Sequence, residues 1–425
     1  MPKYVIIGAS AAGMAAVEAI REVDPIGTIA TISEELCPQY SRPMISDFVS
    51  GKTTFPKMMC RGDDFWSKKN VQALTGRKAT AINFAEKHIS LDNGERVVYE
   101  KLLIATGGKP FVPKMEGADK DGVFTFTTFS DAKRLVKKLE KSKTIVVIGA
   151  GLIGVSVTEA LVKRGLKVTL VELQNKILNL LLDNNGSDII ENVMRKAGVT
   201  IITGQSVQRI IGNPENDQAV GGVILTKGNE ITCDAVIVAI GVVPRTELIT
   251  GTELKLNRGI IVDNFMRTSV PDVYASGDVA ETWDFTINQN RLLPLWPLAV
   301  SQGKVSGYNM AGKKTEYAGG TNMSSLKYFG IPVVSIGITN PKDATPFEIL
   351  VKYGPEENLY KKIVLKDNIV VGIILVNDIE RAGTLFHLMK NRVNVKKFKR
   401  ELISEDFGLA VLPESMRRTM CLGCA

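Results

Sequence analysis

Short apolar runs recur along the chain in a fixed order. An apolar run is followed by a glycine-rich turn, an alanine-rich segment with helical spacing, and a second apolar run that ends in an acid; residues 4–34 form the first copy and residues 144–172 the second. Apolar runs of about four to eight residues are typical of buried strands. A strand–helix–strand order predicts parallel strands joined by right-handed crossovers. The pattern therefore predicts two α/β units.

Both copies continue in the same way. Each carries a hairpin signal, at residues 92–94 and 227–229, and then an apolar run that ends in glycine, at residues 102–107 and 236–241. Turn residues between two apolar runs are typical of β-hairpins. We therefore expect two domains of one plan.

The pattern changes after residue 244. Short strand-like runs precede a helical stretch at residues 298–311, and Gly319 and Gly320 mark a boundary. Residues 323–398 are rich in strand patterns and include a helix at residues 379–390. We expect a third, smaller unit of α+β type here.

Composition narrows the possible classes of protein. The 425 residues include 44% hydrophobic and 23% charged residues, and no apolar run approaches the roughly 18 residues of a membrane span. Five cysteines are too few for a disulfide framework, and no signal-peptide pattern precedes the first strand, so we expect a cytoplasmic protein without a membrane span. Two histidines, His88 and His387, argue against a histidine-based metal site.

The first glycine-rich turn follows a strand and opens a helix, which is the context in which such turns bind dinucleotides. Gly8 permits the tight turn, Ser10 replaces the usual second glycine, and Gly13 lets the helix pack on the strand. We expect the amides at the helix start to bind a diphosphate. Glu34, with Glu35 as the alternative, is expected to accept hydrogen bonds from ribose hydroxyls.

The second turn matches the motif in full, with Gly149, Gly151 and Gly154 at the glycine positions. Glu172 ends the next strand, and an acid there favours NAD(H) because it repels a 2′-phosphate. Lys176 leaves NADP(H) open as an alternative. Two such motifs, each with strand, helix and acid, predict a duplicated dinucleotide site.

With these motifs, residues 1 to about 400 resemble the FAD- and NAD-linked pyridine nucleotide-disulfide oxidoreductase superfamily. The resemblance implies that the first turn holds the FAD diphosphate and the second NAD(H). The run Ala105-Thr106-Gly107 matches the family's Ala-Thr-Gly motif, and Gly277-Asp278 matches its Gly-Asp motif. The resemblance further implies that Asp278 accepts a hydrogen bond from the flavin ribitol.

Two further segments resemble the family. Residues 40–46 are similar to a run in rubredoxin-, ferredoxin- and nitrite-reductase flavoproteins, which implies that Arg42 faces the flavin or its diphosphate. Residues 296–303 resemble a segment whose helix start points at the flavin pyrimidine, where a positive helix end stabilises reduced flavin. The residues expected to bind the two cofactors are Gly8, Ser10, Ala11, Gly13, Glu34, Arg42, Ala105, Thr106, Gly107, Gly149, Gly151, Leu152, Ile153, Gly154, Glu172, Gly241, Gly277, Asp278, Trp296 and Ala299.

The resemblance implies an α/β architecture with two tandem Rossmann-like dinucleotide-binding domains and a C-terminal α+β interface domain. Such an interface domain implies a homodimer, although a hetero-complex could use the same surface. The expected domains are an FAD-binding domain of residues 1–112 and 245–318, an NAD-binding domain of residues 113–244, an interface domain of residues 319–404 and a tail of residues 405–425.

The cysteines depart from the family pattern. Disulfide reductases carry a cysteine pair beside the flavin, and the first domain of this chain has no closely spaced pair, since Cys37 and Cys60 are far apart in sequence. NADH oxidases, peroxidases and coenzyme A disulfide reductases use one cysteine, and Cys37 lies earlier than their position. We therefore expect flavin-centred chemistry without an assigned catalytic residue, with a redox-active Cys37 as the alternative.

Ser156 stands where many family members have a glutamate. In this respect the chain resembles flavoproteins that serve larger iron–sulfur assemblies, such as the flavoprotein subunits of phenylglyoxylate dehydrogenase and carbon monoxide dehydrogenase systems. As a whole the chain resembles the subgroup that contains these subunits and the NADH:rubredoxin and ferredoxin reductases. Near the end of the chain, Cys421 and Cys424 have the spacing of half a zinc or iron–sulfur site. A redox disulfide, a ligand pair completed by a partner and an inert chain end all remain open. No complete metal site is expected.

The net charge of +8 includes one dense basic cluster. A solvated face and a docking patch for an acidic electron carrier are both possible interpretations, whereas a single aromatic residue, Phe398, and no binding motif argue against nucleic acid. The cluster consists of Lys390, Arg392, Lys396, Lys397, Lys399 and Arg400.

Three functions follow from these patterns. The first is an FAD-dependent NAD(H) oxidoreductase that exchanges electrons with an iron–sulfur carrier or a partner redox subunit. The second is an NADH oxidase, peroxidase or coenzyme A disulfide reductase that uses Cys37. The third is a flavin-bound redox-sensing or interaction module. The electron acceptor and the direction of flow stay open.

Overall fold

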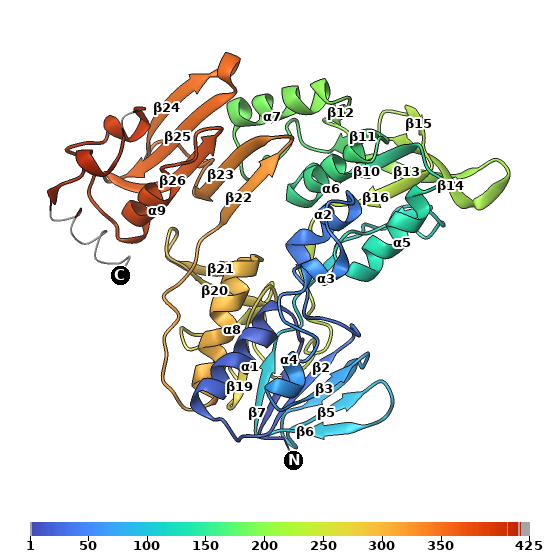
Figure 1. Ribbon diagram of the computed structural model, residues 1–425, viewed down its shortest axis with the longest axis vertical. Helices are drawn as coiled ribbons and strands as arrows, with labels where there is room; N and C mark the ends of the chain where they lie inside the picture. The colour runs from blue at the N-terminus through green and yellow to red at the C-terminus, as the bar shows by residue number, and fades with distance from the viewer. Residues whose placement is uncertain (1, 406, 415–416, 418–425) are drawn as a thin grey trace. The chain divides into compact units, whose positions relative to one another are not determined.

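A computed structural model of the protein describes residues 2–405, 407–414 and 417 (Figure 1). The backbone forms sheets of parallel strands with helices packed on them, so the predicted α/β class is confirmed. Contacts divide the chain into two compact units. Unit 1 contains the residues up to Phe111, Thr127–Lys133 and Val242–Gly320, and unit 2 contains Val112–Phe126, Arg134–Gly241 and the described residues from Thr321 onward.

Unit 1 is built on five parallel strands, most of them formed by short apolar runs. Strand β1 pairs with β2 on one side and with β7 on the other. The chain order therefore changes direction at β1, and the carboxyl ends of the strands lie along one edge, where open α/β sheets bind their ligands. In spatial order the strands are β19 (Val273–Ala275), β7 (Lys101–Ile104), β1 (Tyr4–Ile7), β2 (Ile29–Ser33) and β3 (Val71–Thr75).

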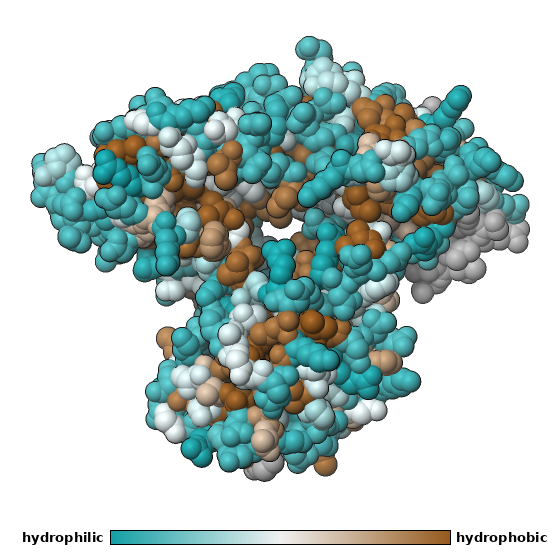
Figure 2. All heavy atoms as spheres, turned by 180° about the vertical axis from the view of Figure 1, so that it is seen from behind, coloured by the Kyte–Doolittle hydropathy of each residue, from teal (hydrophilic) through white to brown (hydrophobic). Residues whose placement is uncertain are grey.

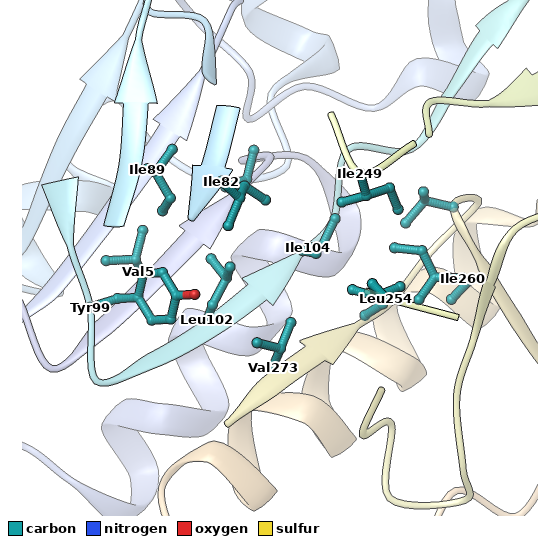
Figure 3. Close-up of a cluster of buried hydrophobic side chains, with 14 of the residues drawn as sticks. Val5, Ile82, Ile89, Tyr99, Leu102, Ile104, Ile249, Leu254, Ile260 and Val273 are labelled. Atoms are coloured by element: carbon teal, nitrogen blue, oxygen red, sulfur yellow. The ribbon is translucent and has the colours of Figure 1, made fainter. Parts of the chain in front are cut away.

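Apolar side chains cover both faces of this sheet because successive residues of a strand point to opposite faces. Val5 belongs to the buried cluster shown in Figure 3, together with Ile82 and Ile89. Ile6 packs on the opposite face with Met14. The elements that supply these clusters include α1 (Ala11–Val23), α4 (Phe65–Lys68), β4 (Ala79–Asn83), β5 (His88–Leu91) and β6 (Arg96–Val98).

Helices α1 and α8 (Trp296–Met310) pack closely through small residues. A Cβ atom on Gly303 would lie 2.2 Å from the Ala12 carbonyl oxygen, and one on Gly307 would lie 2.4 Å from that of Ala16. The contacts advance in the same direction along both helices. The helices are therefore parallel, and their first turns are neighbours.

Unit 2 repeats the plan with a second parallel sheet. Strand β10 pairs with β11 and with β16, so it holds the position that β1 has in unit 1. An antiparallel sheet of β13 (Val207–Asn213), β14 (Asn216–Leu225) and β15 (Glu230–Thr232) follows β12 in the chain. In spatial order the parallel strands are β12 (Thr200–Thr203), β11 (Lys167–Glu172), β10 (Thr144–Ile148), β16 (Ala235–Val238) and β9 (Val123–Phe124).

A five-stranded antiparallel sheet in unit 2 packs against the segment before α7 (Asn184–Lys196). The Ser335 hydroxyl donates to the Leu181 carbonyl at 2.7 Å, and Lys362 forms an ion pair with Asp183 at 2.8 Å. Because Asp183 also caps α7, it joins this helix to the sheet. The sheet contains β22 (Met323–Tyr328), β23 (Ile331–Gly337), β26 (Ile369–Val376), β25 (Leu359–Lys366) and β24 (Glu348–Gly354), with helix α9 (Ala382–Lys390) beside β26.

The predicted hairpins at residues 92–94 and 227–229 are confirmed: they connect β5 to β6 and β14 to β15. The predicted helix at residues 298–311 begins earlier, at Trp296, because Pro297 supplies the fixed φ that suits a first helical turn. The other elements are η1 (Arg42–Met44), α2 (Ile45–Val49), α3 (Phe55–Met58), β8 (Gly108–Pro110), α5 (Phe129–Leu139), α6 (Leu152–Lys163), β17 (Val242–Pro244), β18 (Ile260–Ile261), β20 (Ala280–Asp284), β21 (Gln289–Leu292), η2 (Pro355–Glu357), η3 (Glu401–Ile403) and η4 (Leu409–Val411).

The face shown in Figure 2 carries mostly hydrophilic residues, with apolar patches between them. Among the described residues, no helix has both the length and the hydropathy that crossing a membrane would require.

Candidate functional site

The turn between β1 and α1 depends on two glycines. Gly8 has φ +105°, and a Cβ atom on it would lie 2.0 Å from the carbonyl oxygen of Ala105, at the end of β7. A Cβ atom on Gly13 would lie 2.0 Å from the carbonyl oxygen of Gly8. The amide of Gly8 donates to the Ile32 carbonyl at 2.8 Å. Only glycine permits these approaches, so the turn brings the start of α1 to the carboxyl end of the sheet.

The turn between β10 and α6 has the same construction. Gly149 has φ +97°, its Cβ atom would lie 2.6 Å from the Ala239 carbonyl oxygen, and its amide donates to the Val171 carbonyl at 2.8 Å. A Cβ atom on Gly154 would lie 1.8 Å from the carbonyl oxygen of Gly149. The repeat seen in the sequence is therefore a repeat of the same backbone contacts.

The middle position of the second turn faces open space. A Cβ atom on Gly151 would meet no heavy atom within 4 Å, and Gly151 has an ordinary φ of −78°. The protein itself thus has no need of glycine at this position. Open space beside helix amides is what a cofactor phosphate requires, and the side chain of Ser10 occupies the matching position in the first turn.

Helices α1, α6 and α8 each begin without a side-chain cap, at Ser10, Gly151 and Leu295. The first amides of a helix have no partner within the helix, and the helix dipole makes this end positive. These helix starts can therefore bind anionic groups. The starts of α1 and α8 lie together in unit 1, where Ala11, Ala12 and Ala299 form one apolar cluster with Trp296 and Ala105 packed against it.

Gly277 and Asp278 follow β19 beside these two helices. A Cβ atom on Gly277 would lie 3.4 Å from that of Ala12 and 3.6 Å from that of Ala299, and the Gly277 amide donates to the buried Gln302 side chain at 2.8 Å. Within the described part of the chain, no group hydrogen-bonds the Asp278 carboxylate. An unsatisfied carboxylate beside two helix starts fits a hydroxyl-bearing anionic cofactor.

The environment of Asp278 shifts its titration. Burial raises the pKa of this carboxyl to about 6, although the positive charge of Arg42 acts in the opposite direction. Arg42 therefore lies close enough to Asp278 to influence it. The structure thus brings Ser10, Arg42 and Asp278 together in unit 1.

The glutamate at the end of the second strand is placed differently in the two copies. Glu172 accepts from the amide of Ala150 at 2.7 Å and from that of Gln174 at 2.8 Å, so it lies against the second turn. The amide pairings of Gly8 and Gly149 make Ser33, not Glu34, the equivalent of Glu172. Glu34 lies one residue beyond and forms an ion pair with Arg245 at 3.0 Å.

Glu35, the alternative ribose acceptor, and Lys176, the residue that left NADP(H) open, both have protein partners. Glu35 pairs with Arg42 and accepts a hydrogen bond from the Tyr40 hydroxyl at 2.7 Å. Lys176 pairs with Asp188.

The strand ends opposite the turns are also open. Gly107 and Gly241 have φ of +71° and +116°, and a Cβ atom on either would meet nothing within 4 Å. The Thr106 hydroxyl donates to the Arg245 carbonyl at 3.0 Å. Leu152 and Ile153 open α6 directly after Gly151.

The cysteines do not form a reactive centre among the described residues. Cys37, Cys60 and Cys233 are free. Burial, followed by the charges of Asp63 and Glu35, raises the pKa of Cys37, which disfavours the reactive thiolate. No group of three or more metal-ligating side chains occurs in the described part of the chain, and Cys421 and Cys424 lie outside it.

The comparison with known families agrees with this geometry. The model of the pyridine nucleotide-disulphide oxidoreductase family matches residues 2–303. The chain belongs to this family. A second model, the rubredoxin NAD+ reductase C-terminal domain, matches residues 323–393. The chain is therefore an FAD- and NAD(H)-dependent oxidoreductase, and the predicted resemblance, enzyme class and cofactors are confirmed.

Individual relatives cover nearly the whole chain. The NADH-dependent phenylglyoxylate dehydrogenase subunit epsilon of Aromatoleum evansii is 31% identical over 98% of this chain and 98% of its own length. The nitrite reductase of Bacillus subtilis is 28% identical over 97% of this chain, which spans 51% of that relative. The NADH-rubredoxin oxidoreductase of Clostridium acetobutylicum is 27% identical over 89% of this chain and 91% of its own length.

Solved structures of the family have the same fold. A covalent putidaredoxin reductase–putidaredoxin complex contains a chain with a TM-score of 0.85 and 25% identity, covering 92% of this chain and 94% of that one. The structure of NADH:rubredoxin oxidoreductase from Clostridium acetobutylicum has a TM-score of 0.76 and 25% identity, covering 93% and 97%. Both similarities cover more than nine tenths of each chain, so the shared fold extends over most of this protein.

Sequence patterns did not reveal several residues that shape the site. Gln302 is buried and binds the Gly277 backbone, and Arg245 pairs with Glu34. Tyr40 holds Glu35. Polar spacing alone does not disclose such pairs. Tyr40 and Gln302 carried a signal, because each lies inside a segment that resembles the family.

Variants of two glycines in the second turn test whether the open space beside Gly151 belongs to the cofactor site. Gly151→Ala should leave the free energy of unfolding of the cofactor-free protein within about 0.5 kcal/mol of wild type, because its Cβ atom meets nothing. The same change should raise the Kd for NADH about tenfold or more by narrowing the phosphate site. Calorimetric titration with NADH and chemical denaturation measure the two effects.

Gly154→Ala is the contrasting variant, because its Cβ atom would collide with the Gly149 carbonyl. It should lose about 1–3 kcal/mol of stability. Wild-type affinity for NADH in Gly151→Ala would contradict the assignment of this space to the cofactor.

The raised pKa of Asp278 predicts a pH effect on stability. Its ordinary value is 3.8 and its folded value about 6, so between these values the folded protein binds more protons than the unfolded one. The contribution of Asp278 to stability therefore falls as pH rises from about 4 to about 6. Asp278→Asn should lack this decline. Urea denaturation of the FAD-free proteins measures it, and parallel pH profiles for the two proteins would rule the effect out.

Proposed function

We propose that this oxidoreductase binds the FAD diphosphate at its first turn and NAD(H) at its second, and that it exchanges electrons with an iron–sulfur protein. The observation that carries the proposal is the duplicated turn: two uncapped helix starts, each at the carboxyl edge of a parallel sheet. Such helix starts are suited to diphosphates.

The FAD site in this proposal lies within unit 1. Ser10, Ala11 and Gly13 form the diphosphate turn, and Arg42 provides a positive side chain beside it. Asp278 accepts a hydrogen bond from a ribitol hydroxyl, and the start of α8, with Trp296 and Ala299, supplies a positive end for the flavin. Glu34 is the proposed ribose acceptor, because its ion pair with Arg245 uses one carboxylate oxygen, whereas the Glu35 carboxylate is held by both Arg42 and Tyr40. Ala105, Thr106 and Gly107 border the site at the end of β7.

The NAD(H) site lies within unit 2. Gly149, Gly151 and Gly154 form the turn, Leu152 and Ile153 present the first helical amides, and Gly241 borders the site. Glu172 lies against the turn and retains acceptor capacity for ribose hydroxyls, because a carboxylate accepts more than the two hydrogen bonds present. Lys176 is paired with Asp188, which supports NADH over NADPH.

We assign these sites to domains with the boundaries expected from the sequence. The FAD domain comprises residues 1–112 and 245–318, the NAD domain residues 113–244, and the interface domain residues 319–404. The discontinuous composition of unit 1 supports the first assignment, and the match to a C-terminal domain model at residues 323–393 supports the last.

Bound flavin supplies the redox chemistry, because it accepts two electrons as a hydride and exchanges single electrons. The described residues contribute binding and charge. The basic Arg42 and the positive helix start of α8 favour negative charge in the FAD site. No general base is needed for hydride transfer, which agrees with a chain that has only two histidines.

Relatives support an iron–sulfur acceptor. They include an NADH-rubredoxin oxidoreductase, and a similar solved structure is a putidaredoxin reductase–putidaredoxin complex. The similarity to a phenylglyoxylate dehydrogenase subunit over its full length supports a role within a larger complex. NADH oxidases also occur among the relatives, so oxygen reduction is the second candidate. The raised pKa of Cys37 counts against a thiolate-based version of it.

The basic cluster is the proposed contact for an acidic partner. Lys390, Arg392, Lys396, Lys397 and Arg400 are exposed. Lys399 differs, because it forms an ion pair with Glu348 at 2.7 Å. A single-sign patch attracts a partner of opposite charge and raises its rate of association.

The proposed function predicts a preference among acceptors. Without oxygen, NADH should bleach the flavin absorbance of the purified protein, and the reduced protein should reduce ferredoxin or rubredoxin at least about tenfold faster than it reduces coenzyme A disulfide. Steady-state assays with each acceptor, and with oxygen, measure this. Faster turnover with oxygen, together with its loss in Cys37→Ser, would favour the oxidase alternative; no flux to any acceptor would favour a sensor.

The basic cluster predicts a charge effect on the same assay. Lys396→Glu with Lys397→Glu should raise the KM for an acidic ferredoxin about tenfold at low salt, and the difference should shrink as salt screens the charges. Turnover with ferricyanide should stay at the wild-type level. Lys137→Glu with Lys227→Glu changes the net charge equally at other exposed positions. Equal KM values for the two double variants would contradict a docking patch.

A further inference from the structure

The Arg42 side chain is held by groups from three parts of unit 1. Its Nη1 donates to the Thr127 carbonyl at 2.9 Å, its Nη2 pairs with a Glu35 carboxylate oxygen, and its Nε lies 3.4 Å from the Ser10 hydroxyl. The contact with Ser10 is the longest, so the face toward the first turn is the least tightly held. The side chain is 32% exposed. Arg42 is therefore held most closely by Glu35 and Thr127, and its weakest contact is the one with the first turn.

Glu35 is itself held in place. Its second carboxylate oxygen accepts from the Tyr40 hydroxyl at 2.7 Å, and that hydroxyl accepts from the Phe129 amide at 2.9 Å. Tyr40 is fully buried, and its ring packs beside Phe55 and Phe129 at centroid distances of 6.0 and 5.9 Å. The Glu35 carboxylate that pairs with Arg42 is thus held by a buried tyrosine that packs beside two phenylalanine rings.

The charges around Arg42 explain why it stays positive. Burial by itself lowers the pKa of this guanidinium, but Glu35, Tyr40 and Asp278 outweigh burial and raise the pKa above its ordinary value. Glu35 is the larger of the two carboxylate influences and the one with a direct ion pair, whereas Asp278 acts at longer range.

We propose that Glu35 is a positioning residue, which, supported by Tyr40, holds the Arg42 guanidinium toward the first turn so that it can bind the FAD diphosphate. This inference rests on the proposed FAD site. It assigns Glu35 a role different from that of the ribose acceptor expected from the sequence, because its carboxylate forms an ion pair with Arg42 and is held by the Tyr40 hydroxyl. A guanidinium held in one orientation loses less conformational entropy on binding a phosphate.

A competing effect has the opposite sign. The Glu35 carboxylate is negative, so its removal also raises the positive potential available to a diphosphate. If orientation dominates, removing the charge of Glu35 weakens FAD binding; if competition dominates, it strengthens FAD binding. The sign of the change in FAD affinity therefore separates the two.

The experiment measures FAD binding to apoprotein by flavin fluorescence titration, well below the unfolding temperature. Glu35→Gln should raise the Kd for FAD about tenfold, and Tyr40→Phe, which removes only the supporting hydroxyl, about threefold. Glu18→Gln is the matched control, because Glu18 forms a similar pair with Arg61 in unit 1, at 2.6 and 3.0 Å. It should leave the Kd unchanged.

A double variant separates positioning from simple stabilisation of the fold. In an Arg42→Met background, Glu35→Gln should cause no further rise in Kd, because the inferred role passes through Arg42. The increase in Tm that FAD produces should also shrink in Glu35→Gln, whereas a merely structural role would lower the Tm of apoprotein and holoprotein alike.

Unchanged or tighter FAD binding by Glu35→Gln would overturn the inference. So would a double variant whose rise in Kd equals the product of the rises in Glu35→Gln and Arg42→Met. Failure of the wild-type protein to bind FAD would instead overturn the proposed FAD site. The two failures are therefore distinguishable in one titration series.

Discussion

The arrangement depends on a close contact between a turn and the neighbouring strand end. In unit 1, Gly8 leaves no room for a side chain against the Ala105 carbonyl, and in unit 2 Gly149 stands in the same relation to Ala239. This contact allows the chain to reverse from strand to helix without a clash. It places the first amides of α1 and α6 at the carboxyl edge of their sheets. The other groups of both proposed sites are arranged around these amides.

Unit 1 adds a second helix start to this edge. Gly303 and Gly307 let α8 pack on α1 at close range, so two positive helix ends are neighbours. The positive charge of Arg42 lies nearby, balanced by Glu35 and influenced by Asp278. A site with this balance suits a cofactor that carries a diphosphate at one end and gains negative charge at the other. The charge is supplied by fixed groups, which need little rearrangement when a cofactor binds.

Much of this architecture was predictable because it depends on local chemistry. Glycine at a positive φ, hairpin turn residues and apolar runs are visible in the sequence, and each leads to the element found. In the first copy the acid lies one residue later than in the second, since Ser33 and not Glu34 is the equivalent of Glu172. This difference was not predictable, because it depends on the register of a strand relative to the neighbouring turn. The pairing of Glu35 with Arg42, and the attachment of the C-terminal sheet at Asp183, join distant elements through side chains. Such contacts follow from packing rather than from spacing.

The central claim is that one chain carries two dinucleotide sites, one for FAD and one for NAD(H). Counting bound cofactors tests it most directly. The account predicts that the purified or reconstituted protein holds one FAD per chain, and that one equivalent of NADH, added without oxygen, bleaches its flavin absorbance. A colourless protein that takes up no FAD and does not bind NADH would contradict it.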